Sequence, residues 1–262
     1  MESILEKIVK DKSRDLELTK DSIPLDVLKG QLYDAPIPLN LAGSLMGSSI
    51  RLIAESKKAS PSKGLLSDNY NPGSIALAYA LNGAAAVSVL TESNYFQGSL
   101  EHMDAVSSNI RDKGIPTLRK DFIFDPYQIY EAKAHRADAI LLIVSILTPQ
   151  SLDNLLSICK DLWIQALVEI HDEKELTIAL DAGAEIIGIN NRNLRSFETD
   201  IALTEMLAPK IPKGKIIVSE SGIHTREDII RIQKAGAHAA LIGEALMVSN
   251  NPSEKIEELF KD

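Results

Sequence analysis

A repeated unit that begins near residue 50 and continues almost to the C-terminus constrains the fold of this chain most strongly. Each unit has a short apolar run, then a polar or glycine-containing loop, then a stretch with helical periodicity. The runs are apolar almost throughout and do not alternate, which is typical of parallel strands covered on both faces. We therefore expect strands at residues 50–54, 86–90, 116–119, 139–145, 164–170, 185–189, 215–219 and 239–242.

Several of the intervening helical stretches end in Gly-Ala before the next apolar run. Gly83, Gly183 and Gly236 stand at these points. Glycine there supplies the left-handed conformation in which a helix commonly ends. The expected helices include residues 74–82, 126–135, 151–160, 173–182 and 225–235.

Eight strand–helix units favour an α/β fold, a closed (β/α)8 TIM barrel, over an open doubly wound sheet. A doubly wound dinucleotide-binding sheet would usually carry Gly-x-Gly-x-x-Gly after its first strand, and the sequence contains neither this motif nor a P-loop. The 262 residues are enough for one large core. We therefore expect residues 48–262 to form a barrel that carries the catalytic groups.

Residues 1–47 differ from the repeated units. Ile4, Leu5 and Ile8 recur at helical spacing among charged residues, and prolines interrupt the segment further on. We interpret this segment as an N-terminal helical extension that packs on the barrel within a single overall domain.

Composition excludes several classes of protein. The net charge of −9 and pI near 5.2 argue against a nucleic-acid-binding surface. Cys159 is the only cysteine, so an internal disulfide or a cysteine-based zinc site is excluded, and the five histidines lack metal-ligand spacing. The sequence shows no signal peptide and no apolar run of membrane-spanning length, so we expect a cytoplasmic protein. We expect Cys159 and Trp163 to fill the core.

Charged and polar residues stand at the carboxyl ends of the expected strands, where a barrel gathers its catalytic groups. The segment 55–64, ESKKASPSKG, is the richest, and its Glu55, Lys57 and Ser60 suggest one wall of a site for an anionic substrate. Taken alone, a Glu-x-Lys segment of this kind is more often a solvated connecting loop. The later strand ends add Lys120, Glu169, Asn190, Arg192, Glu220, Ser221, Gly222, Gly243 and Glu244.

Two of these residues raise specific chemical questions. Glu169 lies in an apolar strand, so a cation must satisfy its carboxylate or its raised pKa must serve proton transfer. Lys120 would remain an ammonium ion and proton donor near carboxylates, or become a nucleophilic amine in apolar surroundings.

Two glycine-containing loops indicate the ligand. Ser221-Gly222 and Gly243-Glu244 follow the last two strands, where barrels commonly bind phosphate through backbone N–H groups. We therefore expect a phosphorylated small molecule as ligand. Phe96 and Phe122 stand beside strand ends and could line an apolar part of the pocket or belong to the core.

Together these motifs resemble the indole-3-glycerol phosphate synthase family of tryptophan biosynthesis. The resemblance extends from the N-terminal helix to the last barrel unit. It is carried by segments 55–62 (ESKKASPS), 90–92 (LTE), 95–99 (YFQGS), 119–122 (RKDF), 167–169 (LVE), 188–194 (GINNRNL), 220–223 (ESGI) and 241–247 (LIGEALM).

The resemblance implies a carboxy-lyase that removes CO2 and water from 1-(2-carboxyphenylamino)-1-deoxyribulose 5-phosphate and closes the pyrrole ring of indole. It implies that Lys120 is the general acid of ring closure and Glu169 the acid/base group of dehydration, without any cofactor. Lys57 would hold a substrate anion and donate a proton. Other implied roles are orientation by Glu55, Asn190 and Glu220, binding by Arg192, a phosphate site at Ser221, Gly222, Gly243 and Glu244, and an apolar slot of Phe96, Phe122, Leu141 and Leu194.

Two other functions compete with this interpretation. The first is a Schiff-base aldolase with Lys57 or Lys120 as nucleophile, and the second is a phosphosugar-binding protein without catalytic activity. The presence of both Lys120 and Glu169 argues against the second. We expect no nucleic-acid or membrane partner, and a chain that acts as a monomer or associates with other enzymes of tryptophan biosynthesis.

Overall fold

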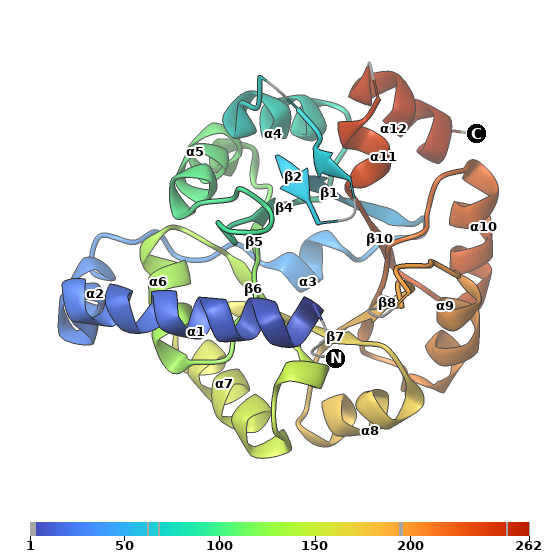
Figure 1. The fold of residues 1–262 in the computed structure, drawn as a ribbon. Helices are drawn as coiled ribbons and strands as arrows, with labels where there is room; N and C mark the ends of the chain where they lie inside the picture. The colour runs from blue at the N-terminus through green and yellow to red at the C-terminus, as the bar shows by residue number, and fades with distance from the viewer. Residues whose placement is uncertain (1–3, 62, 68, 194–195, 250, 262) are drawn as a thin grey trace.

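The computed structural model describes residues 4–61, 63–67, 69–193, 196–249 and 251–261, and parallel strands close into a barrel at its centre (Figure 1). Around the barrel the order is β1-β10-β9-β8-β7-β6-β5-β4, so strands consecutive in the chain are neighbours. The predicted (β/α)8 TIM barrel is therefore confirmed. The barrel strands are β1 (Arg51–Ser56), β4 (Ala86–Leu90), β5 (Thr117–Lys120), β6 (Ala139–Ile143), β7 (Gln165–Ile170), β8 (Ile186–Asn190), β9 (Ile216–Glu220) and β10 (Ala239–Ile242).

Helices surround the barrel, and side-chain caps begin many of them. Asp125, Thr148 and Thr225, for example, each accept a hydrogen bond from a backbone N–H of the first helical turn. Each helix predicted from the sequence is present, with ends shifted by at most two residues. The helices after the extension are α4 (Pro72–Leu81), α5 (Leu100–Ile110), α6 (Pro126–Ala134), α7 (Pro149–Asp161), α8 (Glu173–Asp181), α9 (Ala202–Leu207), α10 (Arg226–Ala235), α11 (Glu244–Met247) and α12 (Pro252–Phe260).

Short elements fill the connections. The fourth barrel strand ends at Ile143, earlier than predicted, because residues 144–146 form a 3-10 turn. Two further 3-10 turns lie at residues 111–113 and 208–210. After β1 the chain forms a hairpin of β2 (Ala59–Ser60) and β3 (Gly64–Leu65), which stands at the rim of the barrel mouth.

The N-terminal segment reaches both ends of the barrel. Helix α1 (Ile4–Ser22) crosses the mouth and is followed by α2 (Leu25–Gln31) beside α6 (Figure 1). Polar contacts hold α1 in place, among them Lys12 Nζ to Asp121 at 2.8 Å. Helix α3 (Leu41–Ser44) closes the opposite end, where Leu41 is fully buried among the interior side chains of the barrel.

Trp163 does not occupy the core, so the prediction made for it is wrong. Its side chain is 80% exposed, whereas Cys159 is buried as expected. Trp163 has a φ of 59° after the end of α7, the left-handed conformation that Gly183 and Gly236 adopt after α8 and α10. This backbone turn directs the indole away from the barrel.

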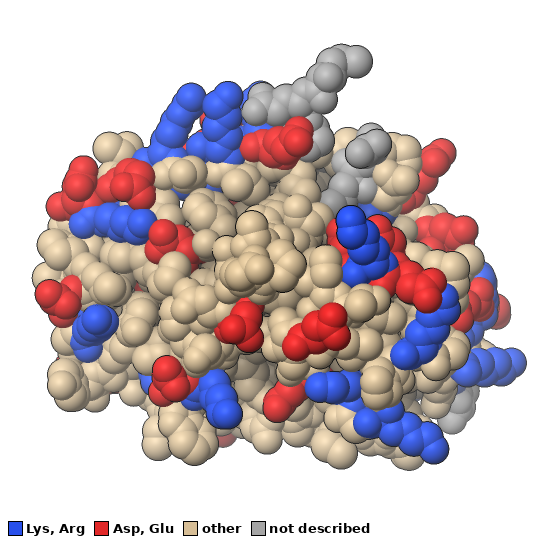
Figure 2. All heavy atoms as spheres, turned by 90° about the horizontal axis from the view of Figure 1, so that it is seen from below, with Lys and Arg blue, Asp and Glu red and all other residues tan. Residues whose placement is uncertain are grey.

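The molecular surface carries mixed charge. On the face drawn in Figure 2, acidic and basic side chains are interspersed around uncharged areas. No helix within the described residues is long and apolar enough to cross a membrane.

Candidate active site

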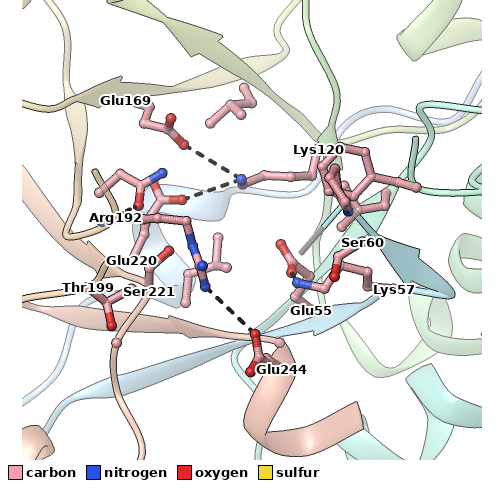
Figure 3. A pocket seen from close by; sticks show the side chains of 18 of the residues that line it. Glu55, Lys57, Ser60, Lys120, Glu169, Arg192, Thr199, Glu220, Ser221 and Glu244 are labelled. Atoms are coloured by element: carbon pink, nitrogen blue, oxygen red, sulfur yellow. Dashed lines mark hydrogen bonds and ion pairs between the residues drawn. The ribbon is translucent and has the colours of Figure 1, made fainter. Parts of the chain in front are cut away.

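A cavity of about 410 Å³ opens at the carboxyl ends of the barrel strands, beneath α1 (Figure 3). Every site residue proposed from the sequence lines it, except Leu194, which lies outside the described residues. These residues come from loops and strand ends far apart in the chain, and the closed barrel brings them together. They are Glu55, Lys57, Ser60, Phe96, Lys120, Phe122, Leu141, Glu169, Asn190, Arg192, Glu220, Ser221, Gly222, Gly243 and Glu244.

Lys120 is the central cation of the cavity. At the end of β5, its Nζ lies 3.6 Å from Oε2 of Glu169 and 3.7 Å from Oε2 of Glu220 (Figure 3). Burial would lower the pKa of Lys120, but Glu169, Glu220 and Glu55 outweigh it and raise the pKa above its usual range. The side chain is therefore an ammonium ion, which can give its proton only to a strongly basic group such as a developing alkoxide, and not a neutral nucleophilic amine.

The two carboxylates beside Lys120 have opposite electrostatic environments. Burial would raise the pKa of Glu169, but the charge of Lys120 and the side chains of His171 and Asn190 outweigh it and lower the pKa. Burial and the neighbouring Glu169 raise the pKa of Glu220, and its carboxylate oxygens accept no hydrogen bond from the described residues. Glu169 is consequently the ionised member, and Glu220 is the member that more readily holds a proton.

On the opposite wall, Glu55 holds Lys57. The Nζ of Lys57 donates a hydrogen bond of 2.7 Å to Oε1 of Glu55, at the end of β1. Burial would raise the pKa of Glu55, but Lys57 and Lys120 outweigh it and lower the pKa. The next residue, Ser56, hydrogen-bonds the Tyr70 hydroxyl at 2.7 Å, which fixes the strand end.

Two glycines make room for the carboxylates of Glu220 and Glu55. A Cβ at Gly188 of β8 would lie 2.1 Å from Oε1 of Glu220, and one at Gly243 would lie 2.3 Å from Oε1 of Glu55. Both positions therefore permit close approach of a buried side chain to the backbone. The sequence predicts a phosphate-binding role for Gly243, and in the structure its missing Cβ makes room for Glu55.

The loops after β9 and β10 form another side of the cavity. Ser221 and Gly222 both have positive φ angles, 67° and 75°. The Glu244 carboxylate is shared by two cations. Arg192 Nη2 lies at 3.7 Å (Figure 3). Lys63 Nζ lies at 3.6 Å. The Glu244 carboxylate would repel a phosphate bound here. The attraction would therefore have to come from Arg192, Lys63 and the backbone N–H groups of these loops.

An apolar wall faces the charged groups. The rings of Phe96 and Phe122 lie with centroids 6.2 Å apart, and both line the cavity together with Leu141. Helix α1 adds Ile4 and Ile8 above them. The cavity thus combines a slot for a flat apolar group with cations for anionic substituents.

Some cavity residues escaped the sequence analysis. Lys63, Phe197 and Thr199 line the cavity from loops in which no periodicity singles them out. His171 has no metal-ligand spacing in the sequence, yet its ring contacts Glu169 from outside the cavity. Gly188 carried a detectable signal, since glycine within a buried strand often marks a close approach. Among the described residues, no cluster of three or more His, Cys, Asp or Glu could hold a metal ion.

Comparison with known proteins identifies the family. The family described as "Indole-3-glycerol phosphate synthase" matches residues 5–259. The chain belongs to the indole-3-glycerol phosphate synthase family. A relative of that name from Dehalococcoides mccartyi (strain ATCC BAA-2266 / KCTC 15142 / 195) is 49% identical, covering 98% of this chain and 100% of its own. Another of the same name, from Campylobacter jejuni subsp. doylei, is 45% identical, with 98% of this chain and 100% of its own covered.

Solved structures outside the family share the architecture. Thiamine phosphate pyrophosphorylase from Pyrococcus furiosus superposes with a TM-score of 0.64 at 14% identity, covering 84% of this chain and 96% of its own. A 3-hexulose-6-phosphate synthase gives a TM-score of 0.63 at 15% identity, covering 80% and 98% respectively. At these identities the likeness shows the barrel fold alone.

Proposed function

We propose that the groups around this cavity divide between them the reaction that defines the family. Family membership gives the activity: a carboxy-lyase of tryptophan biosynthesis that converts 1-(2-carboxyphenylamino)-1-deoxyribulose 5-phosphate to indole-3-glycerol phosphate, CO2 and water. The observation that best supports the division of roles is the Lys120 ammonium between Glu169 and Glu220, facing an apolar wall.

Ring closure is the task of Lys120. The aromatic carbon that bears the carboxylate attacks the ketone carbon of the ribulose chain, and negative charge develops on the ketone oxygen. The Lys120 ammonium stabilises this charge and transfers a proton to the oxygen, which becomes a hydroxyl group. When CO2 leaves, the electron pair of the broken carbon–carbon bond returns to the ring and restores its aromaticity.

Dehydration then needs both an acid and a base. The new hydroxyl leaves as water with a proton from an acid, and the neighbouring ring carbon gives a proton to a base. Glu169 serves as the acid/base group of this step, and Lys57, held by Glu55, donates a proton and binds a substrate anion. Asn190 and Glu220 orient these groups.

Substrate binding follows the division of the cavity into charged and apolar walls. The loops 221–222 and 243–244 receive the phosphate, with Arg192 close by. The anthranilate ring lies against Phe96, Phe122 and Leu141, and Ser60 belongs to the rim. Leu194, assigned to the same apolar slot, lies outside the described residues.

The surroundings of the enzyme follow from its pathway. A phosphorylated metabolite is a substrate of the cytoplasm, so we place the protein there. It acts as a monomer or associates with other enzymes of tryptophan biosynthesis, without a nucleic-acid or membrane partner.

The direct test is to incubate the protein with the carboxyphenylamino-deoxyribulose phosphate and follow indole absorbance and CO2 release. We expect both products in equal amounts. Sodium borohydride, added with the substrate or with a ketose phosphate, should trap no lysine adduct. A trapped adduct, or the absence of an indole product, would contradict the proposal.

A further inference from the structure

His171 lies behind the mouth of the barrel, two residues after Glu169 and just before α8. Its Nε2 forms an ion pair with Oε1 of Glu169 at 3.3 Å, without the geometry of a hydrogen bond, and its Nδ1 is hydrogen-bonded to Oε2 of Glu175 at 3.2 Å. The exposed fractions of the Glu169, His171 and Glu175 side chains are only 4%, 15% and 16%. Charge interactions among the three are therefore weakly screened by water.

The two oxygens of Glu169 face different cations. Oε2 faces Lys120 at 3.6 Å inside the cavity, and Oε1 faces His171 on the other side. Rotation of the Glu169 carboxylate about its Cγ–Cδ bond would disturb both contacts. His171 therefore restrains the direction in which Glu169 presents its oxygen to the cavity.

Glu175 restrains His171 in turn. Its Oε2 accepts a hydrogen bond of 2.7 Å from the backbone N–H of His171. Its own backbone N–H donates to Oδ1 of Asp172 at 2.8 Å, which is the N-terminal cap of α8. The first turn of α8 thus fixes both the backbone and the ring of His171.

We propose that His171 is a positioning residue of the synthase reaction, the middle member of a chain Glu175–His171–Glu169 that aims the Glu169 carboxylate at the substrate. The proposal rests on the acid/base role proposed above for Glu169. Outer partners of this kind are well known to orient reactive side chains in metal sites, and here the same arrangement orients a carboxylate.

The charge of the imidazole follows from its neighbours. The charged groups that act on it are Glu169 from β7 and Glu175 from α8, and its own charge reaches Glu220 on β9. Burial would lower the pKa of His171, but the two contacting carboxylates outweigh it and raise the pKa to about 10. The ring is then doubly protonated at neutral pH, so an N–H group faces each of the two carboxylates, Glu169 and Glu175.

The kinetic test compares His171→Gln and Glu175→Gln with the wild type. In His171→Gln we expect kcat to fall about tenfold near neutral pH, with KM changed by less than about twofold. The acid limb of the kcat–pH profile should move to higher pH, because Glu169 loses a positive neighbour. Glu175→Gln should move it in the same direction by less. The control is His135→Gln, since His135 also pairs with a carboxylate, Asp104 at 2.7 Å, but stands outside the site and should not affect the profile.

A second measurement does not depend on turnover. In protein labelled with 15N-histidine, the His171 resonances can be assigned as the set that persists when each of the other four histidines is replaced by glutamine in turn. We expect a doubly protonated ring in the wild type at about pH 8, and deprotonation at lower pH in Glu175→Gln. This comparison also decides the question if His171→Gln does not fold.

Either of two results would overturn the proposal: a neutral His171 ring in the wild type at about pH 7, or a wild-type pH profile and kcat in His171→Gln. Failure of the wild type to form any indole product would instead refute the proposed function, while the NMR result would still report on the chain of three side chains.

Discussion

The end of β5 places two buried charge clusters on opposite faces of one strand. Arg119 points outward, where its Nη2 lies 2.8 Å from Glu131 of α6 and 3.0 Å from Asp121, the residue after β5, which also borders the cavity. Lys120, between them in sequence, points into the barrel and lies 3.6 Å from Glu169 and 3.7 Å from Glu220. Alternation along a strand thus separates two sets of charges that are adjacent in the chain.

The difference between the clusters lies in how completely they are satisfied. Arg119 also donates to the Thr91 hydroxyl and to the Gln128 carbonyl, at 3.1 and 3.0 Å. The inner cluster has longer contacts, and Glu220 lacks a hydrogen-bond donor among the described residues. We infer that the outer cluster stabilises the fold, whereas the inner cluster keeps bonding capacity for a substrate.

The largest expected effect is on turnover in Lys120→Met. We expect kcat to fall by about 10³-fold or more, because the ammonium that protonates the ketone oxygen is lost. Substrate affinity, measured by fluorescence titration, should change by less than about tenfold. The matched control is Lys113→Met, which removes an exposed lysine paired with Asp112. Near wild-type turnover in Lys120→Met would abolish the distinction between the two clusters.

Arg119→Met should act on stability. Removal of the guanidinium leaves Glu131 without its ion-pair partner and Asp121 with Lys12 as its remaining cation. We expect the free energy of unfolding to fall by about 3–5 kcal/mol, measured by urea denaturation. A loss below about 1 kcal/mol would mean that the outer cluster contributes little to the fold.

Gly188→Ala should disturb the inner cluster without removing a charge. The new Cβ would displace the Glu220 carboxylate, so we expect kcat to fall about 10- to 100-fold with a smaller effect on stability. Gly30→Ala is the control, because a Cβ there meets nothing within 4 Å. Equal kcat values in the two variants would show that turnover does not depend on the position of the Glu220 carboxylate.

The smallest expected effect is on the pH dependence of stability. Burial and Glu169 raise the pKa of Glu220, so its ionisation opposes folding as pH rises above the unfolded-state value. Glu220→Gln should therefore be more stable than the wild type by about 1 kcal/mol at mildly alkaline pH, with the difference vanishing in acid.

Asp121 in the outer cluster should behave in the opposite way. Burial would raise its pKa, but Lys12 and Arg119 outweigh it and lower the pKa to about 2. Its ionisation therefore adds stability above the unfolded-state pKa, and this contribution is lost as pH falls toward about 2. Asp121→Asn should have a lower free energy of unfolding than the wild type, by an amount that becomes smaller in acid. A difference from the wild type that does not change with pH, in both Asp121→Asn and Glu220→Gln, would contradict these assignments.

The sequence predicted the barrel because strand periodicity and helix-ending glycines are local properties. It also predicted which residues at strand ends line one cavity, since the topology of a parallel barrel brings such ends together. Whether Lys120 is an ammonium or a free amine could not be decided in this way. That depends on the distances to Glu169 and Glu220, which belong to other strands.

Tertiary contacts and local backbone conformation explain why the structure differs from the sequence-based prediction at His171 and Trp163. His171 has no distinguishing spacing, and only the start of α8 brings Glu175 to its ring. Trp163 appeared to be a core residue by its chemistry, but a left-handed backbone position turns it outward. Sequence pattern reports which residues are apolar or charged, whereas partners and backbone exceptions arise from tertiary structure.

The central claim is that the inner face of β5 serves the reaction and the outer face serves the fold. The most direct measurement determines kcat per folded molecule and the free energy of unfolding for Lys120→Met and Arg119→Met side by side. We predict that Lys120→Met loses turnover by about 10³-fold with stability within about 1 kcal/mol of the wild type, and that Arg119→Met shows the reverse. Similar losses of both properties in the two variants would contradict the account.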